Sequence, residues 1–130
     1  QTATAADLID KSPFIERYQL ITNDNPNFKV QYFQGSSTST EFKNFYNELK
    51  PDIAFVDGDH SLKGALKDHL LVRSHAKIIV HHDVYSDSCA DTTMLWQSLK
   101  ELESTKENVE FIDQHDSVAG KYLGIGVLYN

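Results

Sequence analysis

The sequence predicts an α/β fold built around a mostly parallel sheet. Two apolar runs without polar alternation, residues 52–60 and 77–83, each end in acids and histidines. Such runs are typical of strands covered on both faces, and the segment between them has helical spacing. This order predicts a parallel β-α-β unit. Over the whole chain, strand and helix patterns alternate until two successive strands close the sequence, as in α/β proteins.

The composition indicates one domain with a small-molecule site. The 130 residues are 40% hydrophobic, enough for a sizeable core, so we expect a single α/β domain over residues 1–130. A net charge of −7 argues against nucleic acid or an anionic membrane as the main partner. The lone Cys89 excludes an internal disulfide, and neither a signal-peptide core nor an apolar stretch of about 20 residues is found. We therefore expect a cytoplasmic location.

Turn residues and apolar spacing define the expected elements. Ser12 before Pro13 marks a helix start, Thr38 with Glu41 forms a capping-box pattern, and Pro51 ends that helix. The expected strands are 2–8, 28–33, 52–56, 77–83, 109–112 and 122–128, with a loop over 113–121 before the last. The expected helices are 12 to about 23–26, 38–50, 61–75 and 92–105. The residues expected to face inward in the helices are Phe14, Ile15, Tyr18, Ile21, Phe42, Phe45, Tyr46, Leu49, Leu62, Ala65, Leu66, Leu70, Met94, Leu95, Leu99 and Leu102.

The candidate site follows the two apolar strands. Ligands bind outside the carboxyl ends of parallel strands, which predicts one crevice shared by five side chains. These side chains are Asp57, Asp59, His60, His82 and Asp83. Because neighbouring side chains of a strand point to opposite sides, we expect His82 in the crevice and His81 packed or facing solvent.

Simpler interpretations stand beside the functional ones. The Asp57-Gly-Asp59 segment could form only a turn, and His60 could only cap the following helix. Asp83 could likewise cap a turn, and Cys89 reads as an inert thiol. The other histidines are expected at the surface or beside helices: His69, His75 and His115.

Three motifs occur in the order seen in one enzyme family. They are Phe-Val-Asp-Gly-Asp-His-Ser at 55–61, Val-His-His-Asp at 80–83 with Cys89 and Trp96 behind it, and Gly-Ile-Gly-Val-Leu-Tyr at 124–129. Together they resemble the class I S-adenosylmethionine-dependent methyltransferases. Within this family they are most similar to the small-molecule and sugar O-methyltransferase branch, which includes macrocin O-methyltransferase. The resemblance covers about Thr2 to Tyr129. It implies a Rossmann-like methyltransferase sheet, mostly parallel with an antiparallel terminal strand.

The resemblance also implies roles for individual residues. S-adenosylmethionine would be the cofactor, with Asp7 at the ribose hydroxyls, Gly35 and Ser36 at the adenine, and Asp57 also beside the cofactor. As in metal-dependent members, Asp57, His82 and Asp83 would hold Mg²⁺ or another divalent cation, since hard cations prefer oxygen ligands. His82 stands where those members have a second aspartate, which would favour Mn²⁺, Fe²⁺ or Zn²⁺. Asp59 and His60 would be catalytic, with Asp59 as the general base.

One feature of the family has no counterpart in the sequence. Members have a first strand, a glycine-rich loop and a helix before the acid that corresponds to Asp7. Three explanations are open: the sequence is the carboxyl-terminal part of a longer protein, another chain supplies the strand, or a rearranged fold has lost cofactor binding. We favour the first.

The leading functional hypothesis is O-methylation of a small-molecule or sugar hydroxyl. A metal ion that lowers the pKa of the acceptor hydroxyl is an optional part of this hypothesis. The alternatives are a metal-dependent hydrolase and a non-catalytic methyltransferase-like binding or assembly module. The expected partner is the acceptor molecule, with no nucleic acid and no membrane. A homo-oligomer, or a chain that supplies the missing strand, is a further option.

Overall fold

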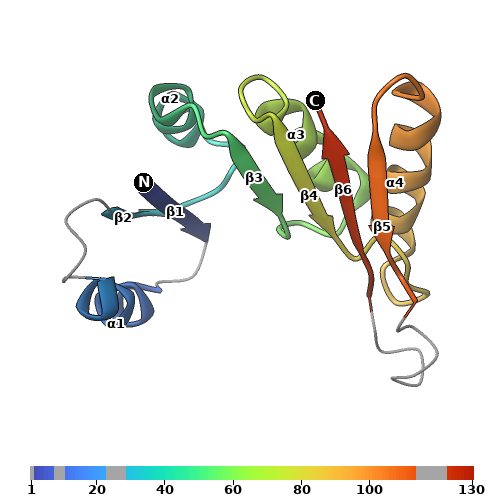
Figure 1. Cartoon of the computed structure of the whole chain (residues 1–130). Coiled ribbons are helices and arrows are strands. Elements are labelled where there is room, and N and C mark those ends of the chain that lie inside the picture. The colour runs from blue at the N-terminus through green and yellow to red at the C-terminus, as the bar shows by residue number, and fades with distance from the viewer. Residues whose placement is uncertain (1, 8–10, 23–28, 114–122) are drawn as a thin grey trace. The chain divides into compact units, whose positions relative to one another are not determined.

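The computed structural model describes residues 2–7, 11–22, 29–113 and 123–130 (Figure 1). These residues belong to two compact units, Gln1–Tyr46 and Asn47–Asn130. Strands and helices alternate along the chain until two strands follow one another at its end, so the α/β class is confirmed. Within the described residues, no helix combines the length and the apolar character needed to cross a membrane. The expectation of one domain over the chain stays a prediction.

The first unit contains a two-stranded parallel sheet. Its elements are β1 (Thr2–Asp7), α1 (Ser12–Thr22), β2 (Lys29–Gln34) and most of α2 (Thr40–Leu49). Strands β1 and β2 pair in parallel, with Asp7 opposite Gln34. The backbone N–H of Gly35 donates to the carbonyl oxygen of Asp7 at 2.9 Å, so the two strands end side by side.

Aromatic side chains join β2 to α2 in this unit. The ring of Phe33 lies 5.2 Å from that of Phe42 and 5.5 Å from that of Phe45, measured between centroids. Such pairs add to the free energy gained from apolar burial. The predicted inward positions of α2 are therefore confirmed for both phenylalanines.

Two details of the first unit differ from the sequence prediction. The cap of α2 is Ser39, whose Oγ accepts from the N–H of Phe42 at 3.0 Å, and not Thr38. Thr38 is engaged elsewhere, because its Oγ1 lies 2.9 Å from Oγ of Ser36 in the preceding turn. In α1, Phe14 is exposed, so its predicted inward position is wrong. The side chains of Tyr18 and Ile21, and residues 114–122 with His115, lie outside what the structure describes.

The second unit contains a four-stranded mixed sheet. Its elements are β3 (Ile53–Val56), α3 (Leu62–Val72), β4 (Ile78–His82), α4 (Ala90–Leu102), β5 (Asn108–Phe111) and β6 (Ile125–Tyr129). The strand order is β3-β4-β6-β5, visible in Figure 1. Strands β3 and β4 are parallel, whereas β6 is antiparallel to both of its neighbours, β4 and β5. The predicted parallel β-α-β unit and the antiparallel last strand are both confirmed.

Helices α3 and α4 pack together, and both contact one face of this sheet. Ala65 of α3 joins Leu95 and Leu99 of α4 in a buried cluster. On β3, burial alternates: Ile53 and Phe55 are 60% and 58% exposed, whereas the residues between and after them are buried. Within the second unit, α3 and α4 cover one face of β3 (Figure 1), and the prediction that β3 is covered on both faces stays a prediction. Other predicted inward positions are also exposed: Leu66, Leu70, Met94 and Leu102.

Candidate metal and active site

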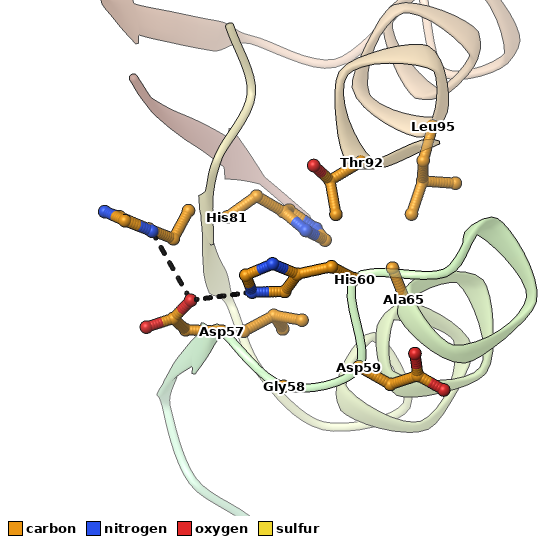
Figure 2. Close-up of a pocket in the computed structure, with 10 residues that line it drawn as sticks. Asp57, Gly58, Asp59, His60, Ala65, His81, Thr92 and Leu95 are labelled. Carbon is orange, nitrogen blue, oxygen red and sulfur yellow. Dashed lines mark ion pairs between the residues drawn. The ribbon is translucent and has the colours of Figure 1, made fainter. Parts of the chain in front are cut away.

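Two carboxylates and two imidazoles meet where β3 and β4 end. Val56 pairs with His81 in the parallel register, which brings the residues that follow each strand to the same edge of the sheet. Nδ1 of His82 lies 3.4 Å from Oδ1 of Asp57 and 2.8 Å from Oδ1 of Asp83. Nε2 of His60 lies 3.5 Å from Oδ1 of Asp57 and 3.1 Å from Oδ2 of Asp83. The dashed lines in Figure 2 mark the two contacts of Asp57. Four of the five predicted crevice residues are thus together.

Asp59 is directed differently from the other four. Its carboxylate accepts a hydrogen bond from the N–H of Ser61 at 2.9 Å, and Figure 2 shows it turned away from Asp57. The same hydrogen bond lowers the pKa of Asp59, which makes the carboxylate a weaker base. Gly64 leaves room for Asp59, because a Cβ at that position would overlap the carboxyl group. In this geometry Asp59 stabilises the turn before α3, and its role as a general base stays a prediction.

Asp83 is buried and its backbone is strained. Its side chain is 1% exposed. Both carboxylate oxygens lie near imidazole nitrogens of His60 and His82, but among the described residues neither oxygen makes a well-aligned hydrogen bond. Its φ of 60° lies in the left-handed region, which is costly for a residue other than glycine. Thr92 holds this conformation, since its Oγ1 donates to the carbonyl oxygen of Asp83 at 2.8 Å. A buried carboxylate without hydrogen bonds is unfavourable unless a cation or other partner compensates it.

The start of α4 brings a thiol to the same place. Sγ of Cys89 lies 3.5 Å from Nδ1 of His60. Oδ2 of Asp91 accepts from the N–H of Leu62 at 2.9 Å, which ties the first turn of α4 to the first turn of α3. Burial and the nearby charge of Asp83 raise the pKa of the Cys89 thiol. Without a cation, this thiol keeps its proton at neutral pH.

Two groups of side chains have the geometry of metal ligands. In each group the ligand atoms all lie within 4.8 Å of one another. The first group is the predicted one, Asp57, His82 and Asp83, and the second is His60, Asp83 and Cys89. Sequence reasoning missed Cys89 as a ligand. The signals for it were its place behind Val-His-His-Asp in one of the family motifs and in the polar loop after Asp83, and it was interpreted there as an inert thiol.

A buried histidine pair lies behind this site. Nδ1 of His69 is 3.1 Å from Nε2 of His81, and the ring of Trp96 lies 5.8 Å from that of His81. Burial, together with His69, lowers the pKa of His81 to about 4. Burial also lowers the pKa of His69, although Glu103 at 3.5 Å opposes that shift. The predicted packing of His81 is confirmed, and the predicted surface position of His69 is wrong, because α3 turns this residue toward the sheet and α4.

The candidate cofactor residues of the first unit lie at the ends of β1 and β2. The Asp7 carbonyl accepts from the Gly35 N–H, as described above, and Oδ2 of Asp7 is 3.8 Å from Nζ of Lys11. A Cβ on Gly35 would lie 2.8 Å from the ring of Phe33, so this position favours glycine. Oγ of Ser36 accepts from the N–H of Thr38 at 3.2 Å. The structure thus brings Asp7 and Gly35 together, while Asp57 belongs to the second unit.

Comparison with protein-family models, with curated proteins and with solved structures finds no match to this chain. The chemistry of the site is therefore derived from its own geometry: two carboxylates, two imidazoles and one thiol beyond the ends of β3 and β4.

Proposed function

We propose that the protein is an S-adenosylmethionine-dependent methyltransferase that methylates a hydroxyl group of a small molecule or sugar with the help of a divalent cation. The observation that carries this proposal is the shared contact of Asp57 and Asp83 with His60 and His82 at the ends of two parallel strands. The antiparallel last strand supports a Rossmann-like methyltransferase sheet, because the family that the sequence resembles closes its sheet in this way.

The first unit supports the cofactor part of the proposal. A carboxylate at the end of β1 can accept hydrogen bonds from both hydroxyl groups of a ribose, which is the role proposed for Asp7. The turn after β2 begins with Gly35, and the lack of a side chain there lets a planar base approach the backbone. The hydrogen bond between these two residues fixes their spacing.

The second unit supplies groups that can prepare a hydroxyl for reaction. When bound, S-adenosylmethionine provides a methyl group on a sulfonium, and a cation lowers the pKa of a hydroxyl that it binds. The hydroxyl proton must leave for the oxygen to attack, and His60 can take it at Nδ1, because its Nε2–H is oriented by the carboxylates of Asp57 and Asp83. His60 is half exposed, so an acceptor can reach it from solvent. The Asp59 carboxylate is the second candidate base.

Methyl transfer to a panel of phenols, sugars and other small hydroxyl compounds tests the proposal. We expect transfer from S-adenosylmethionine labelled in its methyl group, a loss of activity with EDTA, and recovery when a divalent cation is returned. His60→Gln should lower kcat at least tenfold, and comparison with Asp59→Asn identifies the base. Hydrolysis of phosphate or ester substrates without methyl transfer would replace the proposal with a hydrolase. No reaction and no cofactor binding would favour a non-catalytic module.

A further inference from the structure

We propose that His60, Asp83 and Cys89 form a thiolate-containing site for a transition-metal ion of the zinc class. This inference goes beyond the proposed function, because it assigns a ligand role to Cys89 and a metal role to His60. If His60 binds the ion it does not take the hydroxyl proton, and the base in the proposed reaction is then Asp59. It also stands whether or not the protein transfers methyl groups.

The first support is the state of Asp83. Its carboxylate is 1% exposed and, among the described residues, has no hydrogen bond of good geometry to either oxygen. The strained backbone at this residue is held by Thr92, so the carboxylate is kept in place at a cost in free energy. Buried charges in proteins are paired or bind metal ions. Two imidazoles lie beside this carboxylate, Nε2 of His60 at 3.1 Å and Nδ1 of His82 at 2.8 Å, and a cation bound to Asp83 would compensate its buried charge more fully than these neutral rings.

The second support is the position of the thiol. Cys89 stands at the start of α4, but its side chain makes no capping hydrogen bond there. Its carbonyl oxygen accepts from the N–H of Thr93 at 3.1 Å and lies 2.8 Å from Oγ1 of Thr92, whose one proton it shares with the carbonyl oxygen of Asp83. These contacts fix the residue next to the site, where its thiol lies beside the imidazole of His60.

The third support is the spacing of the three ligands. Zinc bonds of about 2.0 Å to nitrogen and oxygen and about 2.3 Å to sulfur place tetrahedral ligand atoms roughly 3.3–3.6 Å apart. One ligand atom from each of the three side chains lies within 4.8 Å of the other two, so the ligand atoms have to draw closer together to reach the tetrahedral spacing around an ion. The three ligands leave a fourth position for water or substrate, as in catalytic zinc sites.

The ligand types select the ion. A thiolate and an imidazole favour zinc-like ions over Mg²⁺, which requires oxygen ligands in octahedral geometry. His82 would then orient Asp83 rather than bind the ion, because its Nδ1 lies 2.8 Å from Oδ1 of that residue. Such outer contacts raise the affinity of metal sites. The alternative group, with Asp57 and His82 as ligands, would favour a harder ion.

Titration of the metal-free, tag-free protein with Co²⁺ tests the proposal, in the presence of a reductant that carries no thiol. The chain has one cysteine, so a thiolate-to-cobalt charge-transfer band in the near ultraviolet can arise only from Cys89. We expect one equivalent of Co²⁺ to produce this band, Zn²⁺ to remove it, and excess Mg²⁺ to leave it unchanged. Cys89→Ser should abolish the band. Cys89→Ser and His60→Gln, as separate single variants, should each weaken Co²⁺ binding at least tenfold. The histidine control His75→Gln, which changes a residue paired with Asn47, should bind as the wild type does.

Three results would overturn the proposal: no binding of Co²⁺, binding without the charge-transfer band, or full affinity in Cys89→Ser together with loss of binding in Asp57→Asn. The last result would assign the ion to Asp57, His82 and Asp83. Circular dichroism of each variant shows whether it is folded, and serine is close enough in size to cysteine to preserve the packing. Binding of S-adenosylmethionine to the metal-free protein is measured separately, so the failure of one proposal is distinguishable from the failure of the other.

Discussion

Nε2 of His60 lies 3.1 Å from Oδ2 of Asp83, although the two residues follow different strands. The side chain of His60 is 47% exposed and that of Asp83 is 1% exposed, so the pair extends from the surface into the interior of the second unit. A ligand held between them would be fixed on its inner side by a rigid carboxylate and would remain open to solvent on its outer side. This combination of a fixed and an open side suits a site that binds an ion and exchanges a small molecule.

Replacement of Asp83 by asparagine should separate stability from metal binding. In the metal-free protein at pH 8, Asp83→Asn should change the free energy of unfolding by no more than about 1 kcal/mol, because it removes a buried charge and keeps an oxygen beside the imidazoles of His60 and His82. Asparagine also tolerates a positive φ. Binding of Co²⁺ should weaken at least tenfold. Urea unfolding and cobalt titration measure the two effects.

The control for this change is Asp52→Asn. Asp52 is exposed and pairs with Lys77 at 2.7 Å, and it precedes β3, whereas the candidate ligand Asp57 follows the other end of that strand. Surface ion pairs contribute little to stability, so we expect unchanged unfolding and unchanged metal binding. A large loss of stability in metal-free Asp83→Asn would show that the carboxylate is already well compensated without an ion.

The buried histidine pair should make the protein less stable in mild acid. Burial lowers the pKa of His81 from its ordinary value of 6.5 to about 4 in the folded protein, and the pKa of His69 is also lowered. Between these pH values the unfolded chain binds more protons than the folded one, so stability is complete above pH 6.5 and falls as the pH drops toward 4. At roughly 1.4 kcal/mol per pH unit, His81 accounts for a loss of about 3 kcal/mol.

Fluorescence of Trp96, the only tryptophan in the chain, reports this transition because its ring lies against His81. Urea unfolding of the metal-free protein from pH 7 to about 5.5 should show the first part of the loss. Above about pH 5.5 most carboxyl groups are ionised in the folded and the unfolded chain, so the lowered pKa values of Glu103 and Glu110 contribute little to the pH dependence there. His69→Gln should make the free energy of unfolding depend less steeply on pH, and His75→Gln should leave this pH dependence unchanged. Equal slopes in all three proteins would contradict the assignment.

Gly126 of β6 allows Trp96 to pack against the sheet. A Cβ at Gly126 would lie 2.6 Å from two ring atoms of Trp96, which is itself buried. Gly126→Ala should therefore destabilise the protein by about 1–3 kcal/mol through overpacking and should shift the Trp96 emission. Gly58→Ala is the control, because the only close atom there is the carboxylate end of Asp68. A smaller effect for Gly126→Ala than for Gly58→Ala would be inconsistent with this packing.

The strand ends could be predicted from the sequence because their polar residues directly follow apolar runs. Parallel pairing of β3 with β4 then places Asp57 and Asp83 at one edge whatever the details of the loops. Cys89 could not be placed in this way. Its position depends on the hydrogen bonds of Thr92 and Thr93 that fold the loop back onto Asp83, and hydrophobic periodicity carries no information about such contacts.

The buried face of α3 shows a second limit of sequence patterns. Apolar spacing selected the face with Leu66 and Leu70, but these leucines are exposed. The face turned inward carries Ala65, Asp68, His69 and Val72, also at helical spacing. His69 contacts His81 and Glu103 from other elements, and such polar contacts decide which face is buried. Judged by residue type alone, a histidine and an aspartate are expected at the surface.

Calorimetric titration with S-adenosylmethionine tests whether the protein is a methyltransferase. We predict that the complete protein, with the glycine-rich loop that the resemblance implies, binds one equivalent, that S-adenosylhomocysteine competes, and that Asp7→Asn binds at least tenfold more weakly, because that change removes an acceptor for the ribose hydroxyls. Glu16→Gln, which changes an exposed acid of α1, should bind as the wild type does. The absence of binding at millimolar cofactor, or equal affinity for wild type and Asp7→Asn, would contradict the assignment.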